Sequence, residues 1–390
     1  MKIKSYSLIL IFATFMSIAA VAAENSVIID LEKIKPLTPI EFLPQAEFEQ
    51  KTKLFEDTPY DDKFLSFQIR LPSDWEETTL PNSVVFSEKG GLNQNVLGIV
   101  ARYVGPPINH QRSSFSVEAV ELTHEIGARD WFIYYVMKSG LSIEQVGLES
   151  EKQVEAIYVE IVNDITYIVR VKVIVNGPRM IVARYFLPQD NYKEERELQA
   201  QIIDSFQLTN RQEIPIEPLE IYGFLDQSFF DYPASWALSS PNIRSIERMR
   251  AMVYHGTAQT ELAGQINIYL SNKILGTTKS EELTYYKDKF VIDGYHIGNF
   301  IEDINLEYHK DMTFGRTQAY EMKSNTTELI DYELWVSVLE NDQYIYAVTL
   351  LTPGRNEDFY TWARNKSAYS MVIKGIRLKD ENVDYYRFLK

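Results

Sequence analysis

The residues best suited to chemistry are five histidines, and their spacing does not define a site. His124-Glu125 could begin the His-Glu-x-x-His motif of zinc proteases, but Ala128 stands where the second histidine is needed. The histidines lack the spacing of metal ligands: His110, His124, His255, His296 and His309. The chain has no cysteine, and it has no nucleophile motif, phosphate-binding glycine loop or calcium-loop pattern. The sequence therefore predicts no catalytic, cofactor-binding or metal-binding residues, and a protein that is not an enzyme.

Acidic residues dominate the charged composition. The chain has 55 Asp and Glu against 39 Lys and Arg, and its formal net charge is −16. Neighbouring carboxylates such as Asp61-Asp62 are best explained as a solvated acidic face, because catalytic use requires a perturbing environment. This charge repels nucleic acid and anionic lipid headgroups, so we expect neither as a partner.

One aromatic run could bind a partner. Residues 131–137 read Trp-Phe-Ile-Tyr-Tyr-Val-Met, which is typical of a helix buried between a sheet and a linker. The alternative is an exposed apolar groove that accepts a helix or strand of another protein. The candidate partner-binding residues are then Trp131, Phe132, Tyr134 and Tyr135.

The first 23 residues have the pattern of a secretory signal peptide. Lys2 and Lys4 precede an apolar run over 8–21, and small residues lead to a cleavage site after Ala23. A retained membrane anchor is the alternative, but the run falls short of the about 20 residues that a span requires. We expect export to the periplasm without later membrane insertion. The protein is not expected to be a lipoprotein, because no cysteine follows the signal.

Residues 24–59 are expected to form an extended arm. Pro36, Pro39 and Pro44 interrupt any regular element, and the segment becomes acidic after residue 46. Such an arm could lie along the protein's own surface. It could also dock on a partner in extended form, at little cost in ordering.

The remainder repeats one plan twice. The stretch Phe64 to Trp75 alternates apolar and polar residues before a Pro-x-x-Trp step, and Ser228 to Trp236 echoes it. Trp75 and Trp236 are 161 positions apart, and corresponding hairpin asparagines 165 apart. The slowly drifting offset predicts two similar α+β domains, over 60–211 and 219–379, with a linker at 212–218 and a tail at 380–390.

Each repeat is expected to alternate strands and helices in the same order. In the first, we predict strands over 64–71, 83–87, 96–103, 156–162, 166–175 and 180–187, a helical pattern from about 117 to 138, and a closing helix over 192–203. In the second, we predict strands near 250–254, 264–270, 317–323, 332–339 and 344–351, and helices over 280–290 and 357–372. Asn176-Gly177 is the strongest hairpin signal.

These motifs resemble the PsbP/Mog1-like family. The resemblance is carried by the Phe-x-Ile-x-Leu-Pro-Ser-Asp-Trp strand that ends at Trp75, and by the Asp-Ser-Phe-x-Leu that ends at Leu208. The second copy departs from it, with Ala-Ser before Trp236 and Gly-Ile before Arg377. The resemblance implies an antiparallel sheet flanked by helices in each domain. It also implies structural roles for Trp75 and Trp236 and no catalytic residues, since the family's shared property is protein binding.

The sequence leads to two hypotheses of function. The first is a non-enzymatic, exported scaffold or adaptor that binds other proteins of a bacterial cell-envelope complex, such as a secretion or conjugation apparatus. The alternative is a periplasmic solute- or carbohydrate-binding protein that uses the cleft between its domains. Neither hypothesis requires a cofactor, and the oligomeric state stays open.

Overall fold

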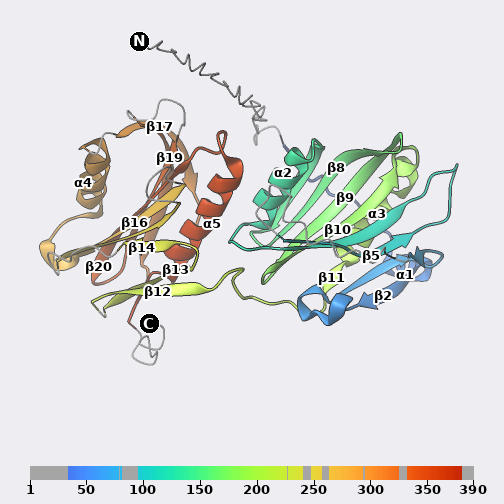
Figure 1. Cartoon of the computed structure of the whole chain (residues 1–390), viewed down its shortest axis with the longest axis horizontal. Helices are drawn as coiled ribbons and strands as arrows, with labels where there is room; N and C mark the ends of the chain where they lie inside the picture. The colour runs from blue at the N-terminus through green and yellow to red at the C-terminus, as the bar shows by residue number, and fades with distance from the viewer. Residues whose placement is uncertain are drawn as a thin grey trace, which may run out of the picture.

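The chain folds into two lobes that lie side by side (Figure 1). The computed structural model describes residues 34–78, 80, 95–225, 227–239, 247–256, 263–292, 295–324 and 332–379. The N-terminal lobe ends at β11 (Gln207–Leu208) and the C-terminal lobe begins at β12 (Leu219–Phe224). Residues 209–218 connect them. Both lobes combine antiparallel sheets with helices, which confirms the predicted α+β class.

A large sheet of eight strands forms the frame of the N-terminal lobe, in the order β1-β7-β8-β9-β10-β6-β5-β4. Its strands are β1 (Lys35–Pro36), β4 (Glu76–Glu77), β5 (Asn95–Val104), β6 (Ser114–Glu121), β7 (Ser142–Ser150), β8 (Gln153–Val162), β9 (Ile165–Asn176) and β10 (Arg179–Pro188). A second sheet has the order β11-β3-β2, with β2 (Thr52–Asp57) and β3 (Phe67–Pro72). The helices are α1 (Gln45–Lys51), α2 (Ala128–Lys138) and α3 (Tyr192–Ser205).

The C-terminal lobe has a seven-stranded sheet in the order β14-β15-β16-β20-β19-β18-β17. Its strands are β14 (Ala237–Ser239), β15 (Arg248–His255), β16 (Gly264–Asn272), β17 (Tyr295–Ile304), β18 (Phe314–Ser324), β19 (Tyr332–Glu340) and β20 (Tyr344–Pro353). The small sheet β12-β13-β21 contains β13 (Ser228–Pro233) and β21 (Arg377–Leu378). The helices are α4 (Lys279–Ile292) and α5 (Phe359–Gly375).

The two lobes share one topology. Read from β7 to β4, the large N-terminal sheet matches the C-terminal sheet from β17 to β14, strand for strand. The small sheets match as well, since β11-β3-β2 corresponds to β21-β13-β12. The only described strand of the large sheets without a counterpart is β1, which the N-terminal arm adds beside β7.

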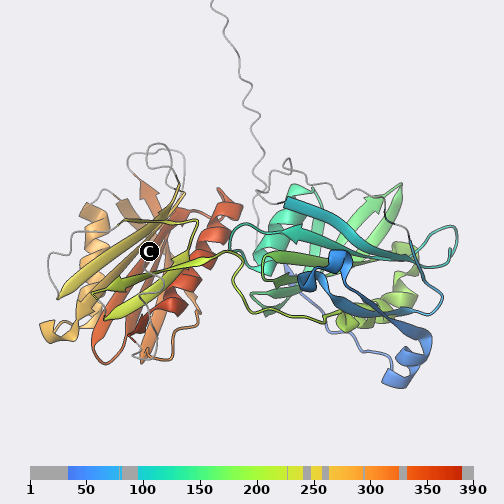
Figure 2. The same cartoon turned by 60° about the horizontal axis from the view of Figure 1, so that its bottom comes forward.

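Side chains pack on both faces of each large sheet. In the N-terminal lobe, α2 covers one face, while α3 and the small sheet cover the other. Trp75 lies in the second of these cores against Tyr185, with ring centroids 5.2 Å apart. In the C-terminal lobe, α5 covers one face and α4 packs on the opposite face (Figure 2). Trp236 is likewise buried, so both tryptophans have the packing environment that the Pro-x-x-Trp step suggested.

Several predicted elements differ from the structure. The helical pattern expected from Val117 is the strand β6, and the helix starts only at Ala128, because Gly127 precedes it in extended conformation. The acidic approach before residue 60 contains α1 and β2, and β2 pairs with β3. The edge strands β7 and β17 were not predicted. The expected strand over 83–87, the signal peptide and the tail at 380–390 lie outside the described residues.

The turn residues predicted between β8 and β9 and between β9 and β10 are confirmed by their backbone conformations. Gly177 has φ of +57° between β9 and β10, and Asn163 and Asp164 both have positive φ between β8 and β9. Asn176 is also fully buried. Its side-chain amide donates to the Phe64 carbonyl at 2.8 Å and accepts from the Gln212 amide at 2.6 Å. The hairpin end therefore anchors the start of the connection between the lobes.

In the part of the chain that the structure describes, no helix is both long enough and apolar enough to cross a membrane.

The groove between the lobes as a candidate binding site

The two lobes meet through α2 and α5. Asp130 on α2 is almost completely buried, and its carboxylate pairs with the Lys366 ammonium on α5 at 2.9 Å. One turn further along α2, Tyr134 stacks on Tyr360 with ring centroids 4.7 Å apart. A buried ion pair beside an aromatic stack gives the contact a defined geometry, because each charge depends on the other lobe for its partner.

A pair of glutamates fixes the connection to both lobes. The Glu125 carboxylate, just before α2, accepts hydrogen bonds from the backbone amides of Ile216 at 2.5 Å and Glu217 at 3.3 Å. In return, the Glu217 carboxylate accepts from the Glu125 amide at 3.3 Å and from the Ser235 amide at 3.0 Å. Since Ser235 belongs to the turn before Trp236, this reciprocal set joins the linker to each lobe at once.

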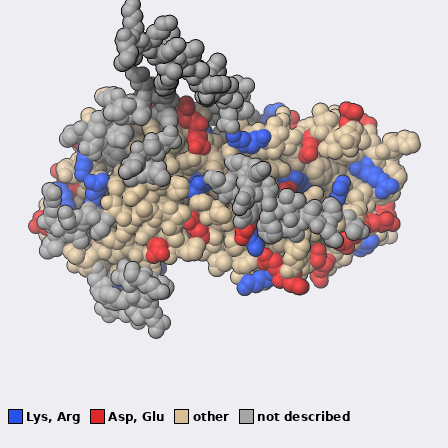
Figure 3. Space-filling view, viewed as in Figure 1, with Lys and Arg blue, Asp and Glu red and all other residues tan. Residues whose placement is uncertain are grey.

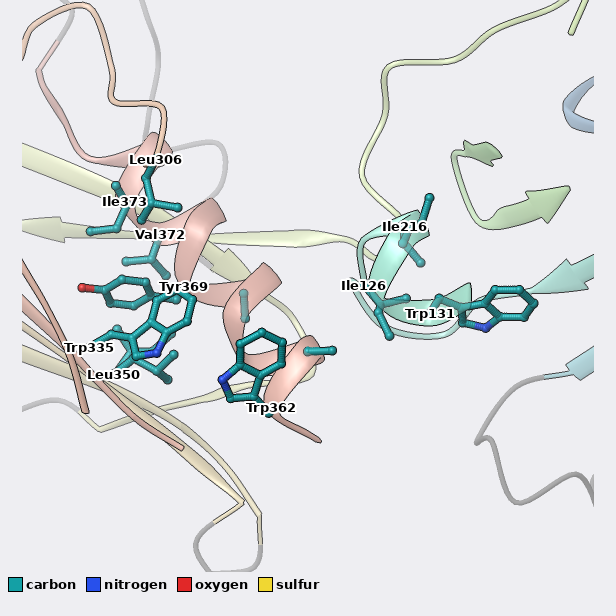
Figure 4. Close-up of a cluster of buried hydrophobic side chains, with 14 of the residues drawn as sticks. Ile126, Trp131, Ile216, Leu306, Trp335, Leu350, Trp362, Tyr369, Val372 and Ile373 are labelled. Atoms are coloured by element: carbon teal, nitrogen blue, oxygen red, sulfur yellow. The ribbon is translucent and has the colours of Figure 1, made fainter. Parts of the chain in front are cut away.

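A groove opens beside the contact. It consists of two adjoining volumes of about 650 Å³ and about 550 Å³. Both volumes are bounded by Gly127, Ser150 and Glu151 from one lobe and by Asn305, Leu306 and Ser367 from the other. Figure 4 shows Ile126, Trp131 and Ile216 on the N-terminal side, opposite Leu306 and Trp362 on the C-terminal side. These sizes are within the range of ligand pockets, which is about 300–1,000 Å³.

Most charged side chains at the groove are paired with one another. Besides Asp130–Lys366, Glu302 pairs with Arg355 at 2.8 Å, and Glu307 pairs with Lys374 at 2.5 Å. Glu213 lies 3.4 Å from Lys152. A general acid or base needs a proton-transfer group that is free to react, and these carboxylates are engaged in ion pairs. These ion pairs therefore hold the charged side chains in place along the groove.

Behind the groove, Glu333 is a buried carboxylate with many donors. It accepts from the Arg355 guanidinium at 2.7 and 3.1 Å, and from the indole N–H groups of Trp335 at 3.1 Å and Trp362 at 2.9 Å. Burial alone would raise the pKa of Glu333, but these donors and the Arg355 charge hold it below the usual value. Because both tryptophans are buried, neither offers an open ring face to a sugar.

Two titratable groups near the linker have shifted pKa values. Burial raises the pKa of Glu125 to about 7, against the opposing effect of its two backbone donors. Burial also lowers the pKa of His124 to about 4, helped by the nearby charge of Arg364. The ring centroids of His124 and His255 are 6.1 Å apart, in an edge-on arrangement. Within the described ranges, no group of three or more His, Asp or Glu side chains could hold a metal ion.

The strand β17 forms one side of the groove and the outer edge of its sheet. Its residues Ile301, Glu302, Asp303 and Ile304 line the smaller volume. Among the described strands, β17 pairs only with β18. This edge strand was not predicted, because bulges between Ile297 and Phe300 and between Phe300 and Glu302 interrupt the period-2 alternation by which strands are recognised.

The aromatic run proposed for partner binding lies on α2, and it divides between two roles. Trp131 and Phe132 are buried in the lobe core, at 1% and 0% exposed, so they present no surface to another protein. Tyr134 and Tyr135 are half-buried. Tyr134 contacts Tyr360 across the lobes, and Tyr135 stacks on Trp131. The interpretation as a buried helix, rather than the alternative of an exposed groove, therefore describes Trp131 and Phe132.

Comparison with known proteins gives distant structural likenesses. No family model matches the chain, and no curated protein matches it. The Ran-binding protein Mog1p of Saccharomyces cerevisiae has a TM-score of 0.30 and 9% identity, covering 42% of this chain and 97% of Mog1p. The cyanobacterial PsbP of Synechocystis has a TM-score of 0.29 and 15% identity, covering 44% of this chain and 99% of its own. DynU16, from the dynemicin biosynthetic locus, has a TM-score of 0.15 and 7% identity, covering 78% and 98% of the two chains. These values do not place the chain in a family.

Proposed function

We propose that the protein is a non-enzymatic adaptor of the bacterial cell envelope, exported to the periplasm, which binds a segment of another envelope protein between two Mog1/PsbP-like domains. The concrete setting is a secretion or conjugation apparatus. The observation that supports binding is the groove itself, since both lobes contribute to it and one side of it is an open sheet edge. Open edges are a recurrent means of recognising extended peptides.

The internal arrangement of charge supports a binding role over catalysis. Carboxylates at the groove are held by cations of the same chain, as in Asp130–Lys366 and Glu302–Arg355. The shifted carboxyl group, Glu125, accepts two backbone hydrogen bonds that hold the linker. Its raised pKa thus accompanies a structural task.

The test is site-specific cross-linking in envelope fractions. A photoreactive amino acid at position 367, on the groove, is compared with one at Glu220, which is exposed on β12 and does not line the groove. We expect Ser367 to yield one stoichiometric cross-linked protein and Glu220 to yield none. Equal products from both positions, or a clean monomer from both, would count against the adaptor.

A small-molecule ligand is the second candidate, because the groove has the volume of a ligand site. A ligand that binds only the native state raises the melting temperature by mass action. A thermal-shift screen of sugars, amino acids and peptides therefore separates the two functions. A specific rise with a monomeric solute would favour the solute-binding protein over the adaptor.

A further inference from the structure

Three basic side chains meet at the boundary between the lobes, outside the groove. His124 precedes α2 in the N-terminal lobe, His255 ends β15 in the C-terminal lobe, and Arg364 lies on α5. The two imidazole rings have centroids 6.1 Å apart, and Nη2 of Arg364 lies 3.3 Å from Nε2 of His255. All three side chains are half-buried, and none of them lines either volume of the groove. The cluster is therefore a separate feature that remains in contact with solvent.

The guanidinium of Arg364 lies in this cluster without a carboxylate partner among its described contacts. These contacts are the His255 ring and the face of Tyr360, whose centroid lies 5.7 Å from Cζ of Arg364. Its Nε atom is buried and has no hydrogen-bond acceptor. Burial lowers the pKa of Arg364, and the more remote charges of Glu217 and Asp358 do not offset this effect. The desolvated charge of Arg364 thus lacks a close counter-ion.

The two carboxylates whose charges act on Arg364 are engaged elsewhere. Glu217 accepts hydrogen bonds from backbone amides of both lobes. Asp358 caps the start of α5, where it accepts from the Thr361 amide at 3.0 Å. Because both carboxylates already serve backbone donors, moving either one onto Arg364 would leave buried or helical amides without their acceptors.

The cluster favours an anion over a metal ion. Imidazole is a common metal ligand, but the guanidinium is permanently charged and approaches Nε2 of His255 to 3.3 Å. A cation on that nitrogen would lie beside the charge of Arg364. The charged groups that act on His124 are Arg364 and His255, and both lower its pKa as positive charges do. The charge of Arg364 likewise lowers the pKa of His255.

Protonation of the histidines would increase the need for an acceptor. The contact between Arg364 and His255 is a hydrogen bond only while Nε2 carries no proton, because a guanidinium only donates. Once His255 is protonated, two donors face each other. In His124, Nδ1 lies 2.6 Å from the Thr123 hydroxyl, which leaves Nε2 as a further donor in the protonated ring. An oxyanion has enough lone pairs to accept from all three side chains.

We infer that His124, His255 and Arg364 form a binding site for an oxyanion, a sulfate, phosphate or carboxylate group, which bridges the two lobes. The site uses no residue that lines the groove, so this inference is independent of the proposed function. The planar guanidinium suits the paired oxygens of such a group. The net charge of −16 opposes an anion at long range, but exposed charges are screened beyond about 10 Å at about 0.1 M salt.

The experiment follows the C2 protons of the histidines by NMR while sulfate is added to the chain from residue 24 onward. Sulfate is the probe because its charge stays constant near neutral pH. We expect the signals of His124 and His255 to shift together and to saturate. Because binding takes up protons, the affinity should rise about tenfold between a pH of about 7 and about 5. His110 is the internal control, since it is exposed and lies outside the cluster. No saturable shift, or equal shifts of all three signals, would overturn the inference.

Substitution of the guanidinium supplies the second arm. Arg364→Gln should weaken sulfate binding about tenfold, because it removes a charged donor. Arg364→Lys retains the charge without the planar fork and should give an intermediate affinity. Arg102→Gln is the matched control, because Arg102 is an exposed arginine on β5, outside the cluster. Unchanged affinity in Arg364→Gln, with folding verified by its melting curve, would contradict the assigned site.

A pair of peptides identifies the source of the oxyanion. Acetylated diglycine with a free carboxylate is compared with the same peptide as its amide. Tighter binding of the free acid than of sulfate would indicate the carboxyl terminus of another protein, and the reverse order would indicate a free inorganic ion. Equal binding of the acid and the amide would contradict an oxyanion site. Failure of the site leaves the adaptor function intact, because cross-linking at Ser367 tests the groove separately.

Discussion

Glu125 and Glu333 show how the surroundings of a buried carboxylate set its behaviour. Glu333 has a guanidinium and two indole donors, and its pKa is lowered. Glu125 has two backbone amides and no cation at hydrogen-bonding distance among its described contacts, and burial raises its pKa to about 7. One carboxylate is thus stabilised in its charged form, and the other carries a desolvation cost.

Glu125 should make stability depend on pH. The folded pKa of about 7 exceeds the ordinary value of 4.5, so the folded state holds the proton more firmly than the unfolded state. Its contribution is full below pH 4.5 and is lost as the pH rises through 7. Relative to Glu125→Gln, we expect the wild-type free energy of unfolding to fall by on the order of 2 kcal/mol over this interval.

Urea titrations of the wild type and of Glu125→Gln at several pH values measure the difference in their free energies of unfolding. Comparing the two chains cancels the opposite contribution of His124 and His255, whose pKa values burial lowers. Glu220→Gln is the control, because that side chain is exposed on β12. Parallel stability curves for the wild type and Glu125→Gln would show that the Glu125 pKa is not raised.

At the scale of elements, β1 covers an edge of the large N-terminal sheet that would otherwise be unpaired among the described strands. The strand β1 adds hydrogen bonds to the edge of the large sheet, and Leu37 packs beside Gly147. Uncovered sheet edges are prone to pair with other chains. The arm therefore lies along its own lobe over the described residues, as one of the two interpretations of its prolines expected.

Removal of residues 24–40 should uncover β7. We expect faster amide exchange in 142–150, a loss of stability of about 1–2 kcal/mol from the missing hydrogen bond and leucine contact, and self-association at high concentration. Removal of residues 24–33 alone is the control, because it leaves β1 in place. Exchange in β7 that does not change after the longer deletion would contradict the role assigned to β1.

At the scale of the whole molecule, the lobes are joined by contacts that fix their orientation. The apolar cluster runs continuously from Ile126 and Ile216 to Trp362 and Leu306. Lys and Arg lie among Asp and Glu over both lobes on the face shown in Figure 3. The polar part of the junction depends on Glu217, because its carboxylate serves amides from both lobes.

Glu217→Ala should make the orientation of the two lobes relative to each other less well defined. It leaves the amides of Glu125 and Ser235 without their acceptor, so we expect a broader distribution of distances between spin labels placed in the two lobes. Because the chain has no cysteine, labels can be introduced at chosen positions without a background. Glu213→Ala is the control, since this linker side chain is 76% exposed. Equal widths in the two variants would show that Glu217 does not fix the orientation.

The strong periodic elements of this protein are set by its sequence. The hairpin β9–β10, its counterpart β19–β20 and the closing helices α3 and α5 follow from regular apolar spacing and from turn residues such as Asn176-Gly177. Local preference and burial agree in these elements, so a short window of sequence is sufficient. The corresponding order of elements in the two halves was also visible in the sequence, because equivalent residues are separated by a spacing that increases slowly along the chain, from 161 to 165 positions.

The edges and the site were decided only by the tertiary structure. A bulge disrupts the alternation in both β7 and β17, so neither strand has the pattern of its neighbours. The pairing of Asp130 with Lys366, and of Glu125 with the Ile216 amide, joins residues far apart in the chain. Whether Trp131 is buried or exposed depends on the sheet that α2 packs against. A run of apolar residues does not specify that packing. The sequence therefore determines the repeated frame, and the packing of the two lobes determines the groove.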